Sequence, residues 1–189
     1  MADEQGRDSA AALRRLMEIT ASLNSTLNVD ELLGLIMSSA TELLDAETAS
    51  LLLVDEETGE LIVQVATGQP GEEAMKQRVP AGQGIAGWVV ERGEPVVVDD
   101  PARDERFYEG MDQAIGFETR NLVAVPLKVR DRVIGAVEVI NKRGEGGFDQ
   151  QDADLAAALS NQAAIAIDNA RLYAKLADAV VASRMSYRL

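Results

Sequence analysis

Apolar residues recur at helical spacing in the first part of the chain, residues 1–27. Successive members are separated by alternating steps of three and four, which is typical of a helix that packs one face against a partner. The pattern predicts an N-terminal amphipathic helix that takes part in dimerisation. Its stripe consists of Leu13, Leu16, Thr20, Leu23 and Leu27.

A second helix is predicted to begin at Asn28, whose side chain can accept hydrogen bonds from amides of the following turn. Glu31, three residues further on, completes a capping box. The apolar face of this helix consists of Leu32, Leu33, Ile36, Ala40, Leu43 and Leu44.

The spacing changes to that of β-strands after Thr48. An apolar run at 50–54, a turn at 57–60 and alternating apolar positions at 61–66 predict a hairpin. A second hairpin is predicted for 122–129 and 132–140, with a charged turn between its strands. Pro126 in its first strand indicates an edge or a bulge, because proline lacks an amide hydrogen.

The segment between the hairpins begins with a glycine-rich stretch, 82–87, that leads into a short helix closed by Gly93. A brief strand from Pro95 to Val98 is expected next. Residues 99–120 show little periodicity and much charge, so we expect a long loop with some helix. Loops of this length inside a domain are usually functional.

The last part of the chain contains no proline or glycine after Asp149 and predicts one long helix. Two series of residues spaced by sevens give it imperfect coiled-coil character. The helical pattern continues to the last residue, so we expect the chain to be part of a longer signalling protein. The two series are Leu155, Gln162, Asn169, Leu176 and Ser183, and Ala158, Ile165, Leu172 and Ala179.

Together these elements predict an α+β fold, in which an antiparallel sheet carries helices on one face and a long helix ends the chain. The chain has 189 residues, of which 47% are hydrophobic, and this length predicts a single core. No apolar run is long enough to span a membrane, and the acidic start does not resemble a signal peptide. We therefore expect a cytoplasmic protein.

Charge and missing residue types exclude several functions. The formal net charge of −14 disfavours nucleic acid and anionic membranes as partners. The chain has no cysteine and no histidine, which removes thiolate nucleophiles, imidazole bases and the usual zinc ligands. The same absence excludes covalent bilin attachment and histidine-ligated haem. We expect no bound metal, and the scattered carboxylates do not form a catalytic site.

The segment Val79-Pro80-Ala81-Gly82-Gln83-Gly84-Ile85-Ala86-Gly87, in the order of elements above, resembles a GAF domain. The resemblance extends from Leu13 over nearly the whole chain and is strongest between Val79 and Tyr173. It is closest to the cyclic-nucleotide-binding GAF domains of phosphodiesterases and cyanobacterial adenylyl cyclases. It implies three parts: a dimerisation helix at 1–27, a GAF core at 28–168 and a coiled-coil-like connector helix at 169–189.

Those GAF domains share a motif that this chain matches at Asn141, Lys142, Phe148 and Asp152. Ala153 stands where the family has glutamate. The resemblance implies that the lysine and the aspartate bridge and hold the surroundings of the ligand pocket in shape.

The resemblance also implies a ligand, cyclic AMP or cyclic GMP, and a set of pocket residues. Ser50 and Thr67 would face the base, while the amides at Ile85 and Ala86 suit a cyclic phosphate at a helix N-terminus. Glu138 would accept hydrogen bonds from the base or sugar. The full set is Ser50, Thr67, Ile85, Ala86, Tyr108, Ile115, Thr119 and Glu138, with Ile115 in place of a polar residue.

Each of these residues also has a purely structural interpretation. The glycines can serve turns and close packing, Ile85 can belong to the core, and Tyr108 can pack a lid. Glu138 lies in an apolar strand and faces either a cavity or solvent. Two functions therefore stay open: a sensor of a cyclic nucleotide or another small metabolite, and a ligand-free dimerisation module. In both, a homodimer forms through the first and last helices; its orientation and the output domain stay open.

Overall fold

The two predicted hairpins form the middle of one six-stranded antiparallel sheet, with strand order β3-β2-β1-β6-β5-β4. The computed structural model describes residues 14, 28–68, 71–75 and 77–186. The predicted N-terminal helix, with its leucine stripe, lies outside the described residues. The strands are β1 (Ala46–Val54), β2 (Leu61–Ala66), β3 (Arg78–Val79), β4 (Val96–Val98), β5 (Leu122–Val129) and β6 (Arg132–Lys142).

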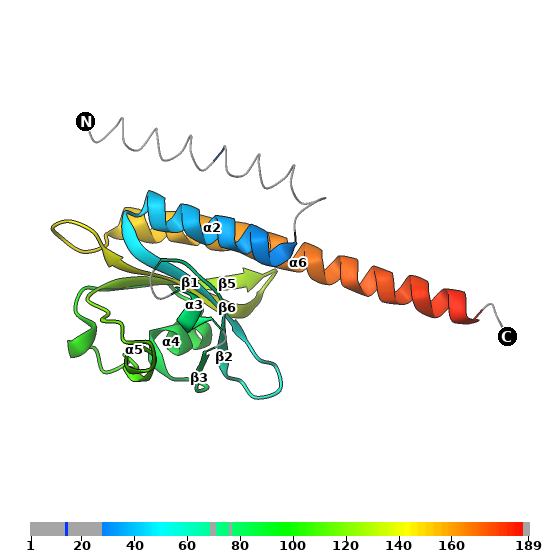
Figure 1. Ribbon diagram of the computed structural model, residues 1–189, viewed down its shortest axis with the longest axis horizontal. Coiled ribbons are helices and arrows are strands. Elements are labelled where there is room, and N and C mark those ends of the chain that lie inside the picture. Colours follow the sequence, from blue (N-terminus) through cyan, green and yellow to red (C-terminus); the bar gives the residue numbers. More distant parts are fainter. Residues whose placement is uncertain (1–13, 15–27, 69–70, 76, 187–189) are drawn as a thin grey trace.

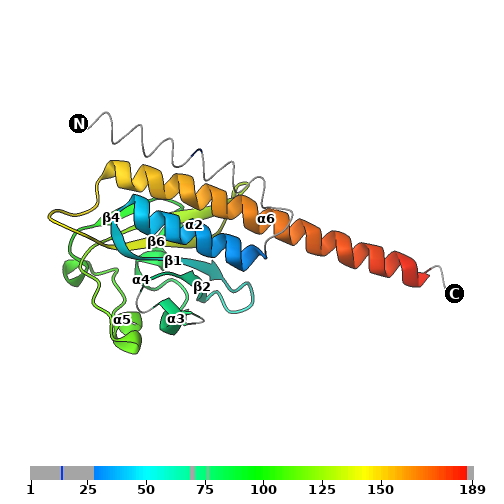
Figure 2. The same cartoon turned by 45° about the horizontal axis from the view of Figure 1, so that its top comes forward.

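Two long helices, α2 (Val29–Leu43) and α6 (Gln150–Ser186), lie side by side across one face of the sheet (Figures 1 and 2). Asn28 caps α2 as predicted, because its side chain accepts a hydrogen bond from the amide of Asp30 at 3.1 Å. The main core lies between these helices and the sheet. Its largest fully buried side chains include Leu33, Ile36, Met37, Leu44, Leu51, Val123, Val125, Leu127 and Leu159.

The opposite face of the sheet carries shorter helices (Figure 1). They are α3 (Gly71–Ala74), α4 (Gly84–Arg92) and α5 (Gly110–Ile115), and a 3-10 turn at Pro101–Arg103 precedes α5. As predicted, α4 ends at Gly93, which adopts the left-handed conformation with φ of 67°. The α+β class is therefore confirmed. The prediction placed helices on one face of the sheet, and α2 and α6 lie there. The short helices cover the second face, which the prediction did not include.

Pro126 lies where β5 is an edge strand. The neighbouring strand β4 pairs only with residues 122–124, so no strand requires a donor from Pro126 on that side. A register shift follows between Leu127 and Lys128. The carbonyl of Pro126 accepts a hydrogen bond from the Ser160 hydroxyl of α6 at 2.9 Å, which ties the long helix to the sheet.

Only the first half of the 37-residue helix α6 packs on the domain. Its buried residues end at Ile167, and residues 171–183 are exposed throughout. This second half projects from the body of the domain toward the C-terminus (Figure 1). In the part of the chain that is described, no helix has the length and apolarity needed to cross a membrane.

Two glycines provide a matched test of the packing. In β6, a Cβ at Gly135 would overlap the carbonyl oxygen of Leu52, whereas a Cβ at Gly34 in α2 would meet no atom within 4 Å. We expect Gly135→Ala to lower the free energy of unfolding by about 2 kcal/mol or more. Gly34→Ala should raise it by about 0.5–1 kcal/mol, because alanine loses less backbone entropy in a helix. Urea unfolding followed by circular dichroism measures both, and equal effects would contradict the packing of β6 against β1.

Candidate ligand-binding site

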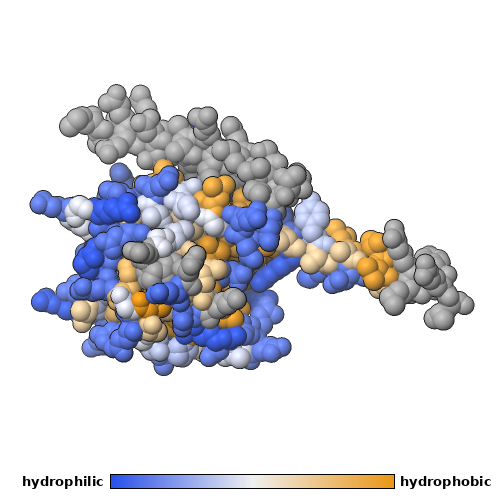
Figure 3. Space-filling view, in the orientation of Figure 1, coloured by the Kyte–Doolittle hydropathy of each residue, from blue (hydrophilic) through white to orange (hydrophobic). Residues whose placement is uncertain are grey.

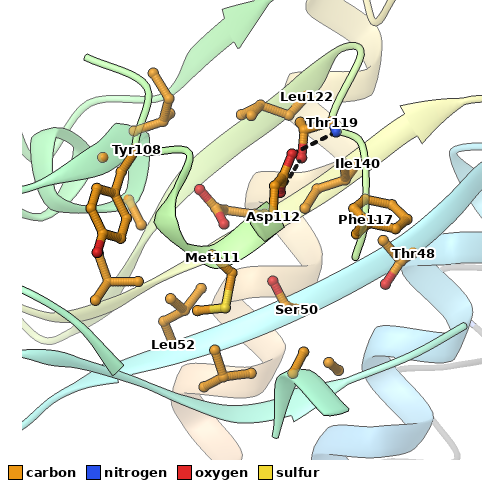
Figure 4. A pocket seen from close by; sticks show the side chains of 18 of the residues that line it. Thr48, Ser50, Leu52, Tyr108, Met111, Asp112, Phe117, Thr119, Leu122 and Ile140 are labelled. Carbon is orange, nitrogen blue, oxygen red and sulfur yellow. Dashed lines mark hydrogen bonds between the residues drawn. The ribbon is translucent and has the colours of Figure 1, made fainter. Parts of the chain in front are cut away.

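A cavity of about 80 Å³ lies between the sheet and the layer of short helices (Figure 4). Strands β1, β2, β5 and β6 contribute its floor, while α3, β3, α4, α5 and the residues around α5 contribute to its wall. Most of the lining is apolar. It includes Thr48, Ser50, Leu52, Ile85, Ala86, Phe107, Tyr108, Met111, Asp112, Ile115, Phe117, Thr119, Leu122, Glu138 and Ile140.

Glu138 reaches the cavity because of the alternation of side chains along β6. Val137 and Val139 pack into the helix-side core, so Glu138 points to the opposite face. Its neighbours across the sheet are Ser50 on β1 and Ala124 on β5. Glu138 therefore stands on a central strand, surrounded by protein, and borders the cavity.

The Glu138 carboxylate forms no hydrogen bond or ion pair with any residue that the structure describes. Burial raises its pKa from 4.5 to about 7, and the nearby charge of Asp112 acts in the same direction. A buried polar group without a partner costs free energy, so such groups are rare in folded proteins. Glu138 is thus available to a hydrogen-bond donor that enters the cavity.

Asp112 on α5 holds the next loop in place. Its carboxylate accepts hydrogen bonds from the Thr119 amide at 2.7 Å and the Thr119 hydroxyl at 2.9 Å (Figure 4). The chain turns between them at Gly116, which is left-handed with φ of 64°. Burial raises the pKa of Asp112, and the two bonds from Thr119 oppose that increase. Thr119 lines the cavity, and its hydroxyl already donates to Asp112.

The N-terminus of α4 forms another part of the wall. The first amides of a helix have no acceptor within the helix. In α4 the side chain of the preceding residue, Gln83, does not provide one either. Ile85 and Ala86 are buried there and line the cavity. The free amides and the positive end of the helix dipole favour a negatively charged or electron-rich group of a ligand.

Among the described residues, the lining of the cavity has two carboxylates, Asp112 and Glu138, and no lysine or arginine. Of these lining groups, the amides at the start of α4 are the ones suited to attract an anion. Near Glu138, the lining favours groups that donate hydrogen bonds, such as amino or amide N–H groups. No set of three or more acidic side chains in the described residues is arranged to hold a metal ion.

Thr67, which is predicted to face the base, does not line the cavity. Its hydroxyl is 2.7 Å from the Thr41 hydroxyl on α2 and accepts a hydrogen bond from the Ala49 amide at 3.0 Å. Thr67 follows the end of β2 and points to the helix side of the sheet, where these bonds connect α2 to the sheet. The other seven predicted pocket residues all line the cavity.

The motif residues Asn141, Lys142, Phe148 and Asp152 meet at the end of β6. The Lys142 ammonium lies 2.6 Å from Asp152 at the start of α6 and 5.5 Å from the centre of the Phe148 ring. Ala153 is buried in the core, so the position where the family has glutamate is apolar here.

Asn141 connects this cluster to the loop that closes the cavity. It is fully buried and left-handed, with φ of 59°. Its side-chain oxygen accepts from the Arg120 amide at 2.7 Å, and its side-chain nitrogen donates to the Glu118 carbonyl at 2.8 Å and to Glu47 at 2.9 Å. The strand that carries Glu138 and the loop that carries Thr119 are therefore held together at this residue.

Several lining residues are absent from the sequence-based set. Asp112 has no feature that separates it from the other acidic residues of 99–120. Thr48 precedes Ser50 by two positions on β1, and this spacing places both on the same face. Met111 belongs to α5 and its side chain points toward Ser50 and Leu52 (Figure 4).

Comparison with known proteins places this architecture in a family. A sequence model of the GAF domain matches residues 26–168. The chain is 31% identical over 171 residues to the probable 3′,5′-cyclic phosphodiesterase pde-5 of Caenorhabditis elegans, covering 85% of this chain and 23% of that protein. It is also 31% identical over 169 residues to the dual 3′,5′-cyclic-AMP and -GMP phosphodiesterase 11A of Takifugu rubripes, covering 84% and 19%.

The chain thus spans about a fifth of the length of these relatives. Among solved structures, it resembles the GAF domain of a phosphoenolpyruvate-protein phosphotransferase from Coxiella burnetii, with a TM-score of 0.76, 22% identity and coverage of 88% of this chain and 98% of that one. A free methionine-R-sulfoxide reductase from Neisseria meningitidis shares the fold, with a TM-score of 0.73, 20% identity and coverage of 87% and 91%. The sheet with helices on both faces agrees with the match to the GAF model, which describes a family of regulatory domains. The chain belongs to the GAF domain family.

The raised pKa of Glu138 predicts a pH-dependent stability. The folded state keeps the Glu138 proton up to about pH 7, whereas the unfolded chain loses it near 4.5, so stability falls as pH rises between these values. Glutamine does not ionise, so Glu138→Gln removes this loss of stability. We expect its free energy of unfolding to exceed that of wild type by on the order of 3 kcal/mol at about pH 8. At about pH 4.5 the two proteins should be equally stable. Denaturant unfolding at several pH values measures the difference.

The control for this experiment is Glu91→Gln, on the exposed side of α4. It should leave the pH dependence of wild type unchanged. Equal curves for Glu138→Gln and wild type would mean that Glu138 is solvated or paired in the folded protein.

Proposed function

We propose that this GAF domain is a sensor of a cyclic nucleotide, cyclic AMP or cyclic GMP, and that it is regulatory and not itself an enzyme. The ligand occupies the cavity between the sheet and α4. Its cyclic phosphate lies at the amides of Ile85 and Ala86, and its base lies toward Ser50 and Glu138. The remaining contacts come from Tyr108, Ile115 and Thr119.

The observation that carries this proposal is the unpaired carboxylate of Glu138. A cavity with free amides at one wall and a free carboxylate at another suits a ligand with an anionic end and a donor-bearing end. A cyclic nucleotide has both, because its phosphate is an anion and its base carries N–H groups. The printed names of the two 31% identical relatives support this ligand class, since both are cyclic-nucleotide phosphodiesterases.

Binding requires the wall around α5 to move. Pockets for ligands of this size have volumes of roughly 300–1,000 Å³, and the cavity has about 80 Å³. Met111 and Tyr108 are the large side chains that occupy the space on this side, and the bonds between Asp112 and Thr119 hold the loop closed. We infer that the ligand displaces these side chains and that the loop closes again over it.

A ligand-free dimerisation module is the second candidate, and the small volume of the cavity favours it. In that case α5 and its neighbours are simply core, and the domain serves to join two copies. The departures at Ile115 and Ala153 also favour it. The two candidates differ in whether any nucleotide changes the surroundings of the cavity.

Under both candidates, we propose that the domain forms a homodimer through the N-terminal helix at 1–27 and the last helix. The GAF core at 28–168 would bind the ligand, and the connector at 169–189 would carry the signal to an output domain. Support comes from the exposed leucines of α6, Leu172 and Leu176, which are 42% and 62% exposed on the projecting part. Leucines so exposed at helical spacing favour a helical partner.

The lone tryptophan of the chain gives a direct measurement of ligand binding. Trp88 lies on α4, and the Arg106 guanidinium stacks 4.7 Å from its ring centre, next to Phe107 and Tyr108 of the cavity wall. We expect cyclic AMP or cyclic GMP to change the fluorescence of Trp88 in a saturable titration and to raise the melting temperature. In Glu138→Gln, affinity should fall by about tenfold or more, because the base loses a charged acceptor.

Glu91→Gln is the matched control and should bind as wild type does. AMP tests whether the cyclic phosphate matters. The sensor proposal fails for cyclic nucleotides if neither one changes the fluorescence or the melting temperature at millimolar concentration, and the dimerisation module then replaces it.

The dimer is tested by a charge in the projecting part of α6. Leu176→Asp should weaken association by about tenfold or more, since a carboxylate would be buried against an apolar surface. The melting temperature of the domain should stay close to that of wild type, because Leu176 does not touch the core. Light scattering across a range of concentrations measures the association, and a wild-type chain that stays monomeric throughout would contradict the proposal.

A further inference from the structure

Exposed large apolar side chains gather on one element. Within the described residues they are Leu35, Met75 and six residues of α6. Figure 3 shows apolar surface on the projecting part of α6, away from the body of the domain. The six are Ile165, Leu172, Tyr173, Leu176, Val180 and Val181.

The projecting helix is amphipathic. At 100° per residue, all of these side chains except Val181 fall on one side of α6, together with Asn169 and Ala179. The charged residues Asp168, Arg171, Lys175 and Asp178 fall together on a different flank. The residues at seven-residue spacing form a seam that carries no charge. They are Gln162, Ile165, Asn169, Leu172, Leu176 and Ala179. An uncharged seam of this kind fits a second helix.

We propose that α6 pairs with α6 of a second copy in parallel and in register, with Asn169 opposite Asn169 of the second copy. The inference rests on the proposed homodimer and adds its direction and its register. An asparagine in a mostly apolar seam can set the register and the number of helices, because its buried amide needs a polar partner such as the same amide of the second helix.

The order of residues along the seam favours the parallel direction. In parallel, each layer contains two identical residues, so Asn169 meets asparagine, Gln162 meets glutamine and the apolar residues meet each other. In the opposite direction, Asn169 would face Leu172 of the second copy, and Gln162 would face Ala179. Both amides would then be buried against apolar side chains without a partner, which is unfavourable.

Charge interactions favour the antiparallel arrangement of the two helices only slightly. There, Asp168 of one copy would approach Lys175 of the other, but both lie at the rim, where ion pairs contribute little. Asp168 also already lies 3.9 Å from Arg130 of its own chain. The match of amide with amide in the seam therefore decides the direction.

The seam continues onto the body of the domain. Ile165 lies on the part of α6 that packs on the sheet, yet it is 49% exposed and stands in line with Leu172 and Leu176. A parallel pair would cover Ile165 with Ile165 of the second copy. The two domains would then lie side by side at the same end of the paired helices.

Single cysteines test the direction, because the chain has none of its own. In Leu176→Cys, a parallel, in-register pair places the two introduced thiols next to each other. We expect an efficient disulfide between identical chains in a glutathione redox buffer. Ala174→Cys, on the far side of the helix, is the matched control and should remain largely reduced.

A mixture of Ile165→Cys and Leu176→Cys, with a tag on one chain, measures the opposite direction. Parallel pairing yields mainly Leu176→Cys with itself and Ile165→Cys with itself. A dominant mixed disulfide overturns the proposal, and so does a dimer in which neither disulfide forms. A wild-type chain that is monomeric in light scattering instead contradicts the homodimer itself, so the two failures are distinguishable.

Replacing the asparagine tests its role in the register. Asn169→Leu should tighten association at least severalfold and make the disulfide pattern less selective, because an all-apolar seam accepts more than one alignment. Ala174→Leu adds a leucine outside the seam and should change neither property. An Asn169→Leu variant with unchanged affinity and an unchanged disulfide pattern would show that Asn169 does not lie in the seam.

Discussion

The alternation of side chains along β6 is the constraint on which the rest of the domain depends. This strand lies between β1 and β5 and is covered on both faces, so each residue must suit one of two environments. Val137 and Val139 face the core under α2 and α6, while Ala136, Glu138 and Ile140 face the side of the short helices, where Glu138 and Ile140 line the cavity. A shift of one residue would bury Glu138 under the long helices and place valines in the cavity, so the register of one strand sets both the core and the site.

The end of β6 connects three parts of the domain: the loop over the cavity, the central strand and the long helix. Asn141 holds the loop at Glu118–Arg120, and the next residue, Lys142, binds Asp152 at the start of α6. The cavity wall, the central strand and the long helix thus meet within two residues. Charged and hydrogen-bonded contacts at two successive residues thus connect the loop over the cavity with the start of the long helix.

Periodicity and capping predicted most of the fold, because these signals are local. The hairpins, the cap at Asn28 and the end of α4 at Gly93 all follow from residues close together in the sequence. The short helices on the second face were not expected as a layer, because α5 has one and a half turns and no buried residue of its own. Seven of the eight residues that the resemblance to GAF domains indicated line the cavity, whereas Thr67, whose direction depends on how the chain leaves β2, does not. The role of Asp112 depends on a bond to Thr119, seven residues away, which no local pattern indicates.

The uninterrupted helix α6 has a mechanical consequence. With 37 residues it is about 55 Å long, and it contains no glycine or proline at which it could bend. A stiff rod transmits rotation as well as displacement, so the angle at which α6 leaves the sheet is carried to its far end. Each added residue turns that end by about 100°. An insertion of seven residues into α6 therefore nearly preserves the direction in which its far end faces. An insertion of two residues turns that end to the opposite side.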